Sequence, residues 1–152
     1  MPGYGVAPAD GGQGLLPWSW AVERLARSRS YWLASTRPDG APHLAAVWGL
    51  WFDGALHFST SGTSRKAANL RHEPRCAMST ERADECVVVE GTATPLTEPT
   101  RLTKLRHGYA EKYGSAFPDP AENPVFALEP RVVFGFIERE EDFSETATRW
   151  RF

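Results

Sequence analysis

The stretch GAPHLAAVWGLWFDGALHFSTSGTSRKAANL, residues 40–70, decides how this chain folds. Its first half predicts two strands, because apolar strand-forming residues flank the pair Asp53-Gly54 on both sides. Asp-Gly favours a type I′ turn, whose two central residues need positive φ, and such a turn joins antiparallel strands into a hairpin. Counting outward from the turn predicts these cross-strand pairs: Phe52 with Ala55, Leu50 with His57, Trp48 with Ser59, and Val47 with Thr60.

The second half of the stretch predicts a helix that begins after the small-residue run of residues 61–64. Hydroxyls and open backbone N–H groups gather at this helix start, and Arg65 and Lys66 stand in its first turn. Cations there oppose the helix dipole, whereas a phosphate would be attracted by the amides, the dipole and both side chains. A solvated basic face on an ordinary short helix is equally compatible with the local pattern.

The order of motifs around this hairpin resembles the pyridoxamine 5′-phosphate oxidase-like split barrels, the flavin and deazaflavin oxidoreductases. The resemblance is carried by the turn at residues 37–40, by Asp53-Gly54, by the run 58–60 and by SRKAANLRHEP at residues 64–74. The ending TRWRF, residues 148–152, is also similar to the carboxyl end of many family members. Together these motifs span most of residues 20–152.

The resemblance implies a mainly β fold with peripheral helices: a six-stranded antiparallel split β-barrel of the FMN-binding type. It implies that a cofactor ring lies, mostly on backbone, along Ala45, Ala46, Val47, Trp48, Phe58, Ser59 and Thr60. Small residues at 45 and 46 permit close approach of a flat ring, although, taken alone, they are better explained by ordinary tight sheet packing. The cofactor phosphate would be held by Ser64, Arg65 and Lys66.

In this family the carboxyl-terminal tail packs at the dimer interface, so the resemblance implies that residues of the tail also contribute to the cofactor site. Arg149 and Trp150 are expected to reach a cofactor bound mainly by the partner chain, in a homodimer with two cofactor sites at the subunit interface. From the sequence alone, a cation beside an aromatic residue at a chain end is equally well explained as a loosely packed terminus.

The sequence contains no nucleophile elbow, phosphate-binding loop or dinucleotide fingerprint, so we predict no catalytic residue of the protein itself. A bound redox cofactor supplies the reactive atom in such an enzyme. The resemblance favours reduced F420 delivering hydride to a conjugated small-molecule acceptor such as a quinone, an enone or a bilin. The anionic tail of F420 would meet Arg65, Arg71 and Arg75. An FMN-binding oxidoreductase is the alternative, and a non-catalytic flavin or tetrapyrrole binder is a third candidate from another class.

Length and charge limit the remaining possibilities. The 152 residues suit one domain, and a net charge of −2 favours neither nucleic acid nor an anionic membrane as partner. We expect residues 1–17, rich in Gly, Pro and Ala, to form a flexible arm before a single split-barrel domain at 18–152. The arm lacks the features of a signal peptide, which predicts a cytoplasmic protein.

Histidine and cysteine spacings predict no metal site, and Cys76 and Cys86 are not placed to form a disulfide.

The other helices and strands are predicted from the periodicity of apolar residues and from the proline and glycine residues that end regular structure. A short helix is predicted from Trp18 and a longer one from Pro99 to a stop at Gly114. Strands are predicted at residues 31–36, 76–80, 86–93 and 132–137, with a bulge or a close backbone approach at Gly91. Four prolines between residues 115 and 130 are expected to prevent a continuous element there, leaving a short edge strand at 125–128.

Overall fold

The computed structural model describes residues 14–139 and 143–152. Most of the expected N-terminal arm, residues 1–13, lies outside the described residues. The helices are α1 (Trp18–Arg27), α2 (Arg65–His72), α3 (Pro99–Tyr113) and the single turn α4 (Phe143–Thr146). The strands are β1 (Ser30–Thr36), β2 (Pro42–Phe52), β3 (Ala55–Ser59), β4 (Arg75–Thr80), β5 (Glu85–Pro95), β6 (Val125–Ile137) and β7 (Thr148–Arg151).

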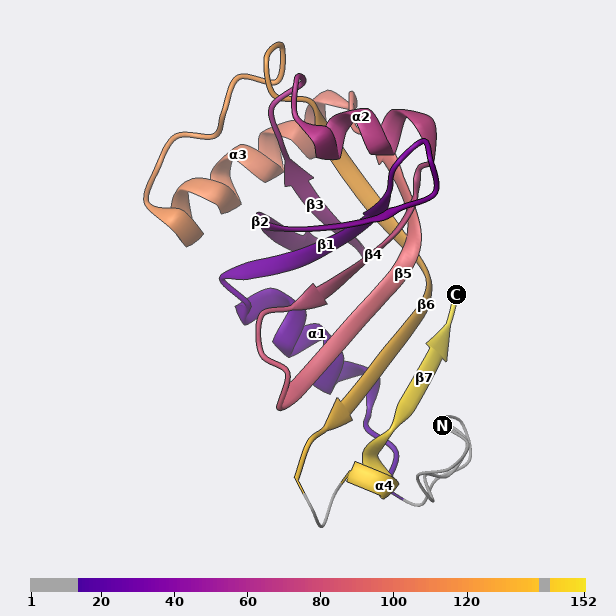
Figure 1. Cartoon of the computed structure of the whole chain (residues 1–152). Helices are drawn as coiled ribbons and strands as arrows, with labels where there is room; N and C mark the ends of the chain where they lie inside the picture. The colour runs from indigo at the N-terminus through magenta and orange to yellow at the C-terminus, as the bar shows by residue number, and fades with distance from the viewer. Residues whose placement is uncertain (1–13, 140–142) are drawn as a thin grey trace.

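The strands form one antiparallel sheet in the order β3-β2-β1-β4-β5-β6-β7, and an additional pairing of β3 with β6 closes the first six into a barrel. β6 uses the same edge twice: residues 125–128 pair with β3, and residues 132–135 pair with β7. In Figure 1, α2 and α3 lie toward the top of the barrel, and β7 runs beside the lower part of β6. The predicted split β-barrel with peripheral helices is therefore confirmed.

The central hairpin forms as predicted. Asp53 and Gly54 have φ of 48° and 73°, as a type I′ turn requires, and Phe52 pairs with Ala55. The ladder follows the predicted register but ends at Gly49 and Phe58, so the two outermost predicted pairs are not part of it. The reason is that the end of β3 follows β6 instead, because Ser59 pairs with Val125.

The segment before the carboxyl end corrects the sequence prediction. Residues 125–128 are no edge strand, since β3 pairs on one side of them and β5 on the other. They belong to a single strand of 13 residues that runs through Pro130. Pro130 is tolerated because it lies between the stretches that β3 and β7 use, opposite Gly91, where the register with β5 shifts. The bulge predicted at Gly91 is confirmed.

The tail forms a seventh strand, which the sequence did not predict. Trp150 of β7 lies opposite Val133, and its ring centroid is 5.3 Å from that of Trp18 in α1. A Cβ atom on Gly135 would lie only 2.9 Å from the Trp150 ring, so this ring fills the space that the glycine leaves. The tail is thus anchored to the barrel core through α1.

Other predictions also hold. α3 ends at Gly114, which has a φ of 67°, and both cysteines are free thiols. The core is a cluster of buried aliphatic and aromatic side chains inside the barrel, the largest of which include Tyr31, Phe58, Leu33, Leu56, Met78 and Leu128. No helix among the described residues is long and apolar enough to cross a membrane.

Gly91→Ala should destabilise the barrel severely. The new Cβ would lie 1.9 Å from the carbonyl oxygen of Glu129, so the β5–β6 ladder must shift. We expect a loss of about 3 kcal/mol in the free energy of unfolding, measured by urea denaturation. The matched control is Gly108→Ala, whose Cβ would meet Leu50 at an ordinary 3.4 Å and whose stability should stay equal or rise. Equal stability of both variants would contradict the close approach.

Candidate functional site

The loop between β3 and α2 is held in one shape by its own hydroxyls and by the segment before β6. Ser64 caps the helix, its Oγ accepting from the Ala67 N–H at 3.2 Å and lying 3.0 Å from Thr60 Oγ1. Ser59 Oγ donates to the Asn123 carbonyl, and the Gly62 N–H donates to the carbonyl of Glu122. The helix start is therefore braced rather than loose.

Two cations stand at this braced helix start without a partner in the described part of the chain. Arg65 is exposed and Lys66 half-buried, and neither side chain takes part in an ion pair formed by the described residues. Their backbone N–H groups occupy the first helical turn, where no intrahelical acceptor exists. The arrangement therefore gathers uncompensated positive charge at the positive end of the helix dipole.

The arginines nearby already have partners. Arg71 donates through both terminal nitrogens to the Gly62 carbonyl at 3.2 Å, so it closes the loop at the start of α2. Arg75 pairs with Glu73, and this hydrogen-bonded pairing lowers the pKa of Glu73 to about 2. Of the three arginines expected to meet an anionic tail, only Arg65 has no partner among the described residues.

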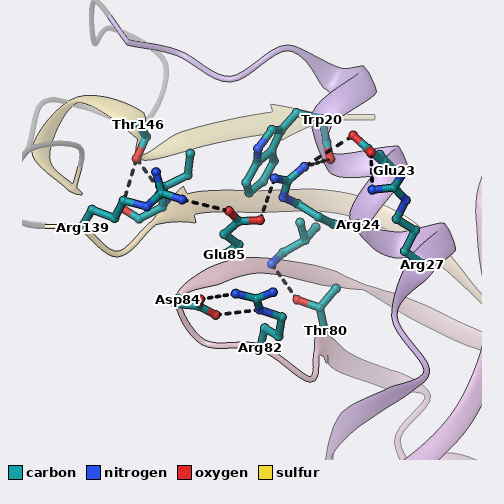
Figure 2. Close-up of polar contacts among 12 residues, drawn as sticks. Trp20, Glu23, Arg24, Arg27, Thr80, Arg82, Asp84, Glu85, Arg139 and Thr146 are labelled. Carbon is teal, nitrogen blue, oxygen red and sulfur yellow. Dashed lines mark hydrogen bonds and ion pairs between the residues drawn. The ribbon is translucent and has the colours of Figure 1, made fainter.

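A second charged cluster, between α1 and the β4–β5 turn, shows what a purely structural arrangement looks like. Figure 2 shows that each guanidinium in it meets a carboxylate: Arg24 with Glu85, Arg27 with Glu23, and Arg82 with Asp84. Arg24 also lies over the Trp20 ring, 3.9 Å from its centroid. This cluster ties α1 to the start of β5 and leaves none of these arginines free for a ligand.

Strand alternation divides the predicted ring-binding residues into two groups. Val47 and Phe58 are buried in the barrel core, so they offer a ligand only their backbone. Ala46 and Trp48 lie on the outer face, where Trp48 remains 43% exposed. Ala45 points inward with Val47, because side chains on a strand alternate.

One row of paired residues runs across six strands on the outer face. Its members, in the order β2, β1, β4, β5, β6 and β7, are Ala46, Trp32, Ser79, Val88, Phe134 and Arg149. The row brings Ala46 and Arg149, which are far apart in the sequence, onto one face. Trp150 alternates to the inner side, where it packs on Trp18, so the structure does not bring it together with Arg149.

Ala46 is the small floor of an apolar shelf. Leu44 and Trp48 flank it along β2, Trp32 lies opposite on β1, and all three large side chains are exposed. Exposed large apolar side chains that lie together are a feature of binding surfaces, so the shelf is a candidate ligand or partner site. We call these four residues, Trp32, Leu44, Ala46 and Trp48, the outer shelf.

The outer face also carries a basic pocket around β7. It is lined by Arg131, Arg149 and Arg151 together with Glu90 and three apolar side chains, Val132, Phe134 and Phe152. Sequence reasoning found Arg149 but missed Trp32, Arg131 and Arg151. No local pattern marks them, because only the strand register shows which residues share the outer face.

The buried polar groups near the site serve the fold. Asn69 donates to Ser35 Oγ at 3.0 Å and so fastens α2 to β1. His57 is fully buried, with Nε2 lying 2.8 Å from an Arg101 nitrogen and Phe52 stacked on its ring at 3.8 Å. Burial lowers the pKa of His57 to about 4, so its ring is neutral and accepts from the guanidinium. Among the described residues, no three His, Cys, Asp or Glu side chains are placed to share a metal ion.

Comparison with known proteins shows the family of the chain. The family model for pyridoxamine 5′-phosphate oxidase matches residues 21–136, which include the hairpin, the start of α2 and most of β6. The chain belongs to this family. No curated protein sequence matches this family member closely enough to compare.

Solved structures place this family member among several relatives. A conserved hypothetical protein from Mycobacterium tuberculosis is 26% identical, with 83% of this chain and 88% of that chain covered and a TM-score of 0.70. An F420 reductase is 25% identical over 73% of this chain and 93% of that chain, with a TM-score of 0.57. A heme-binding protein from Mycobacterium smegmatis, 18% identical over 90% of this chain and 59% of that chain with a TM-score of 0.73, shares the fold.

His57 should make the stability of this family member depend on pH. Its pKa falls from 6.5 to about 4 in the folded state, so the unfolded chain takes up a proton first. The free energy of unfolding should therefore decline by about 3 kcal/mol as pH falls from about 6.5 to about 4. His57→Gln keeps an acceptor for Arg101 but does not titrate, and should flatten this decline in urea denaturation. His107→Gln, at an exposed histidine, is the control and should leave the decline unchanged.

Proposed function

We propose that this protein is an oxidoreductase in which reduced F420 delivers hydride to a conjugated small-molecule acceptor. The observation that carries the proposal is a combination on the consecutive elements β1, β2, β3 and α2. It joins an exposed shelf with a small floor to a helix start with two cations that have no ion-pair partner among the described residues. The shelf suits a flat ring, and the helix start suits a phosphate. The family to which the chain belongs supports an oxidoreductase of the flavin or deazaflavin type.

The residues present fit such a cofactor. The Arg65 and Lys66 N–H groups, the Lys66 ammonium and the Ser64 hydroxyl would hold the phosphate. The ring would lie on Ala46 between Leu44 and Trp48, because a larger side chain at 46 would occupy that floor. In this proposal the ring and the phosphate would lie on either side of the point where β2 and β3 separate, because the β2–β3 ladder ends at Gly49 and Phe58.

When bound, F420 supplies the hydride, and the protein contributes binding, orientation and exclusion of water. Trp32 and Trp48 would shelter the ring from solvent and hold one of its faces toward the acceptor. Lys66 and the start of α2 would hold the phosphate end of the cofactor, and this would determine where the ring lies along the shelf.

Two observations favour F420 over FMN. The F420 reductase is among the similar solved structures. The basic pocket with Arg131, Arg149 and Arg151 offers positive charge on the shelf's own face for the anionic tail of F420. FMN is the second candidate, because its phosphate and ring need only the helix start and the shelf. A tetrapyrrole carrier is the third, supported by the fold that the chain shares with a heme-binding protein.

We propose that a second copy of the chain completes the site. Trp32, Leu44 and Trp48 are 45%, 61% and 43% exposed, and a partner covering this face would bury them. Arg149, on the same outer row, would then lie near the cofactor of the other subunit. Two free thiols suit a reducing compartment, and we propose that the protein acts in the cytoplasm.

Lys66→Ala tests the cofactor site directly. If Lys66 makes a charge-assisted contact with the phosphate, the variant should lose about 1.5 to 3 kcal/mol of binding free energy. The measurement is quenching of tryptophan fluorescence in parallel titrations with F420 and FMN. Lys104→Ala, which removes an exposed lysine paired with Asp53, is the control and should bind like the parent. If the parent binds F420 tightly and Lys66→Ala does not weaken this binding, Lys66 is not part of the site. If neither F420 nor FMN quenches the fluorescence of the parent, the oxidoreductase proposal is contradicted.

Leu44→Glu tests the proposed dimer. Leu44 is exposed in the monomer, so a glutamate there should not disturb folding, but it would place charge in an apolar interface. Sedimentation velocity at micromolar concentration should show a dimer for the parent and a monomer for the variant. Thr94→Glu, at an exposed position on β5, should remain dimeric. A monomeric parent, or a variant that dimerises as tightly, would refute this assembly.

A further inference from the structure

The last turn of α3 lies against the outer shelf. The Trp48 ring stacks on Tyr113 with centroids 4.5 Å apart and ring planes within 2° of parallel. Tyr113 is the final residue of α3, and Gly114 ends the helix directly after it. One face of Trp48 is thus fixed by the helix, while 43% of the side chain remains open to solvent.

The Tyr113 hydroxyl holds the backbone next to Trp48. It accepts from the Gly49 N–H at 2.9 Å and lies 2.8 Å from both the Gly49 and Arg29 carbonyl oxygens, either of which takes its proton. The β1–β2 ladder ends at the pair Ser30 and Trp48, so Gly49, which pairs with β3 on one side, has no β1 residue opposite it on the other. The Tyr113 side chain therefore makes the hydrogen bonds that a neighbouring strand would otherwise make at this point.

Lys112 adds a second tie from the same turn. Its ammonium donates to the Gly49 carbonyl at 3.0 Å and to the Tyr31 hydroxyl at 3.1 Å. Tyr31 in turn donates to the Leu25 carbonyl at the end of α1. The backbone N–H and C=O of Gly49 are thus both bound by side chains from the last turn of α3.

We propose that Tyr113 and Lys112 are positioning residues that hold Trp48 in place as one wall of the outer shelf. Neither residue needs to touch a ligand, because they act through the Trp48 ring and the Gly49 peptide. The inference rests on the proposed function, since it assigns the shelf wall a role in holding the cofactor ring. It adds that the affinity for the ring is set by two residues of α3 that lie 63 and 64 positions beyond Gly49 in the chain.

The test separates the two contacts of Tyr113. Tyr113→Phe keeps the stacked ring but removes the hydroxyl from Gly49, and Tyr113→Leu removes both. Tyr109→Phe is the matched control, because Tyr109 belongs to the same aromatic group but its hydroxyl makes no hydrogen bond among the described residues. The signal of Trp48 among the tryptophans is obtained by subtracting the spectrum of a Trp48→Phe variant.

Two readouts are measured well below the unfolding temperature. Acrylamide quenching of Trp48 should increase severalfold in Tyr113→Leu and Lys112→Met and stay unchanged in Tyr109→Phe. Affinity for F420, or for FMN if that is the cofactor, should fall about tenfold in Tyr113→Phe, equivalent to about 1.4 kcal/mol. Val87→Ala, a core substitution in β5, serves as a destabilised variant whose affinity should not change.

The outcomes separate the two proposals. If Tyr113→Leu leaves Trp48 quenching unchanged, or if Val87→Ala weakens cofactor binding as much as Tyr113→Phe does, the positioning role is refuted. If the parent binds neither cofactor while Tyr113→Leu still exposes Trp48, the proposed function fails and the positioning of Trp48 stands.

Discussion

The double pairing of β3 is the constraint on which the rest of this structure depends. One edge of this five-residue strand continues the hairpin to β2, and the other edge pairs with β6 through residues 125–128. This second pairing closes the barrel and occupies only residues 125–128 of the 13-residue strand β6. Residues 132–135 on the same edge are left for β7, which brings the carboxyl end of the chain onto the sheet. The end of β3 also places the start of α2 beside the point where β2 and β3 separate.

Side chains alternate between the two faces of a strand, and this decides whether a site residue presents its side chain or only its backbone to a ligand. Val47 and Phe58 are buried in the barrel core and Trp150 packs against it, while Ala46 and Arg149 lie on one outer row. A ligand on this face meets backbone from the first group and side chains from the second. Mutating an inward residue therefore tests the core, and mutating an outward one tests the surface.

Electrostatics distinguishes the candidate site from the rest of the charged surface. The arginines around Glu85 are compensated by carboxylates, and such exposed or partly exposed pairs stabilise a fold only modestly. At the start of α2, two cations oppose the helix dipole with no carboxylate among the described residues to offset them. A protein retains such an arrangement at little cost when an anion occupies the site, which connects this local charge to the proposed cofactor phosphate.

The sequence by itself determined what depends on neighbouring residues. The Asp53-Gly54 turn, the Ser64 cap, the stop at Gly114 and the bulge at Gly91 all follow from short-range backbone chemistry, and the motif order indicated the barrel. Tertiary structure alone decided features that depend on distant pairing. A strand passes through Pro130 because the β5–β6 register shifts there and leaves Arg131 of β6 without an opposite residue, and the tail becomes a strand because residues 132–135 of the β6 edge are not used by β3. Trp32 joins Ala46, and Tyr113 reaches Gly49, because strand register and helix docking bring together residues that no local pattern connects.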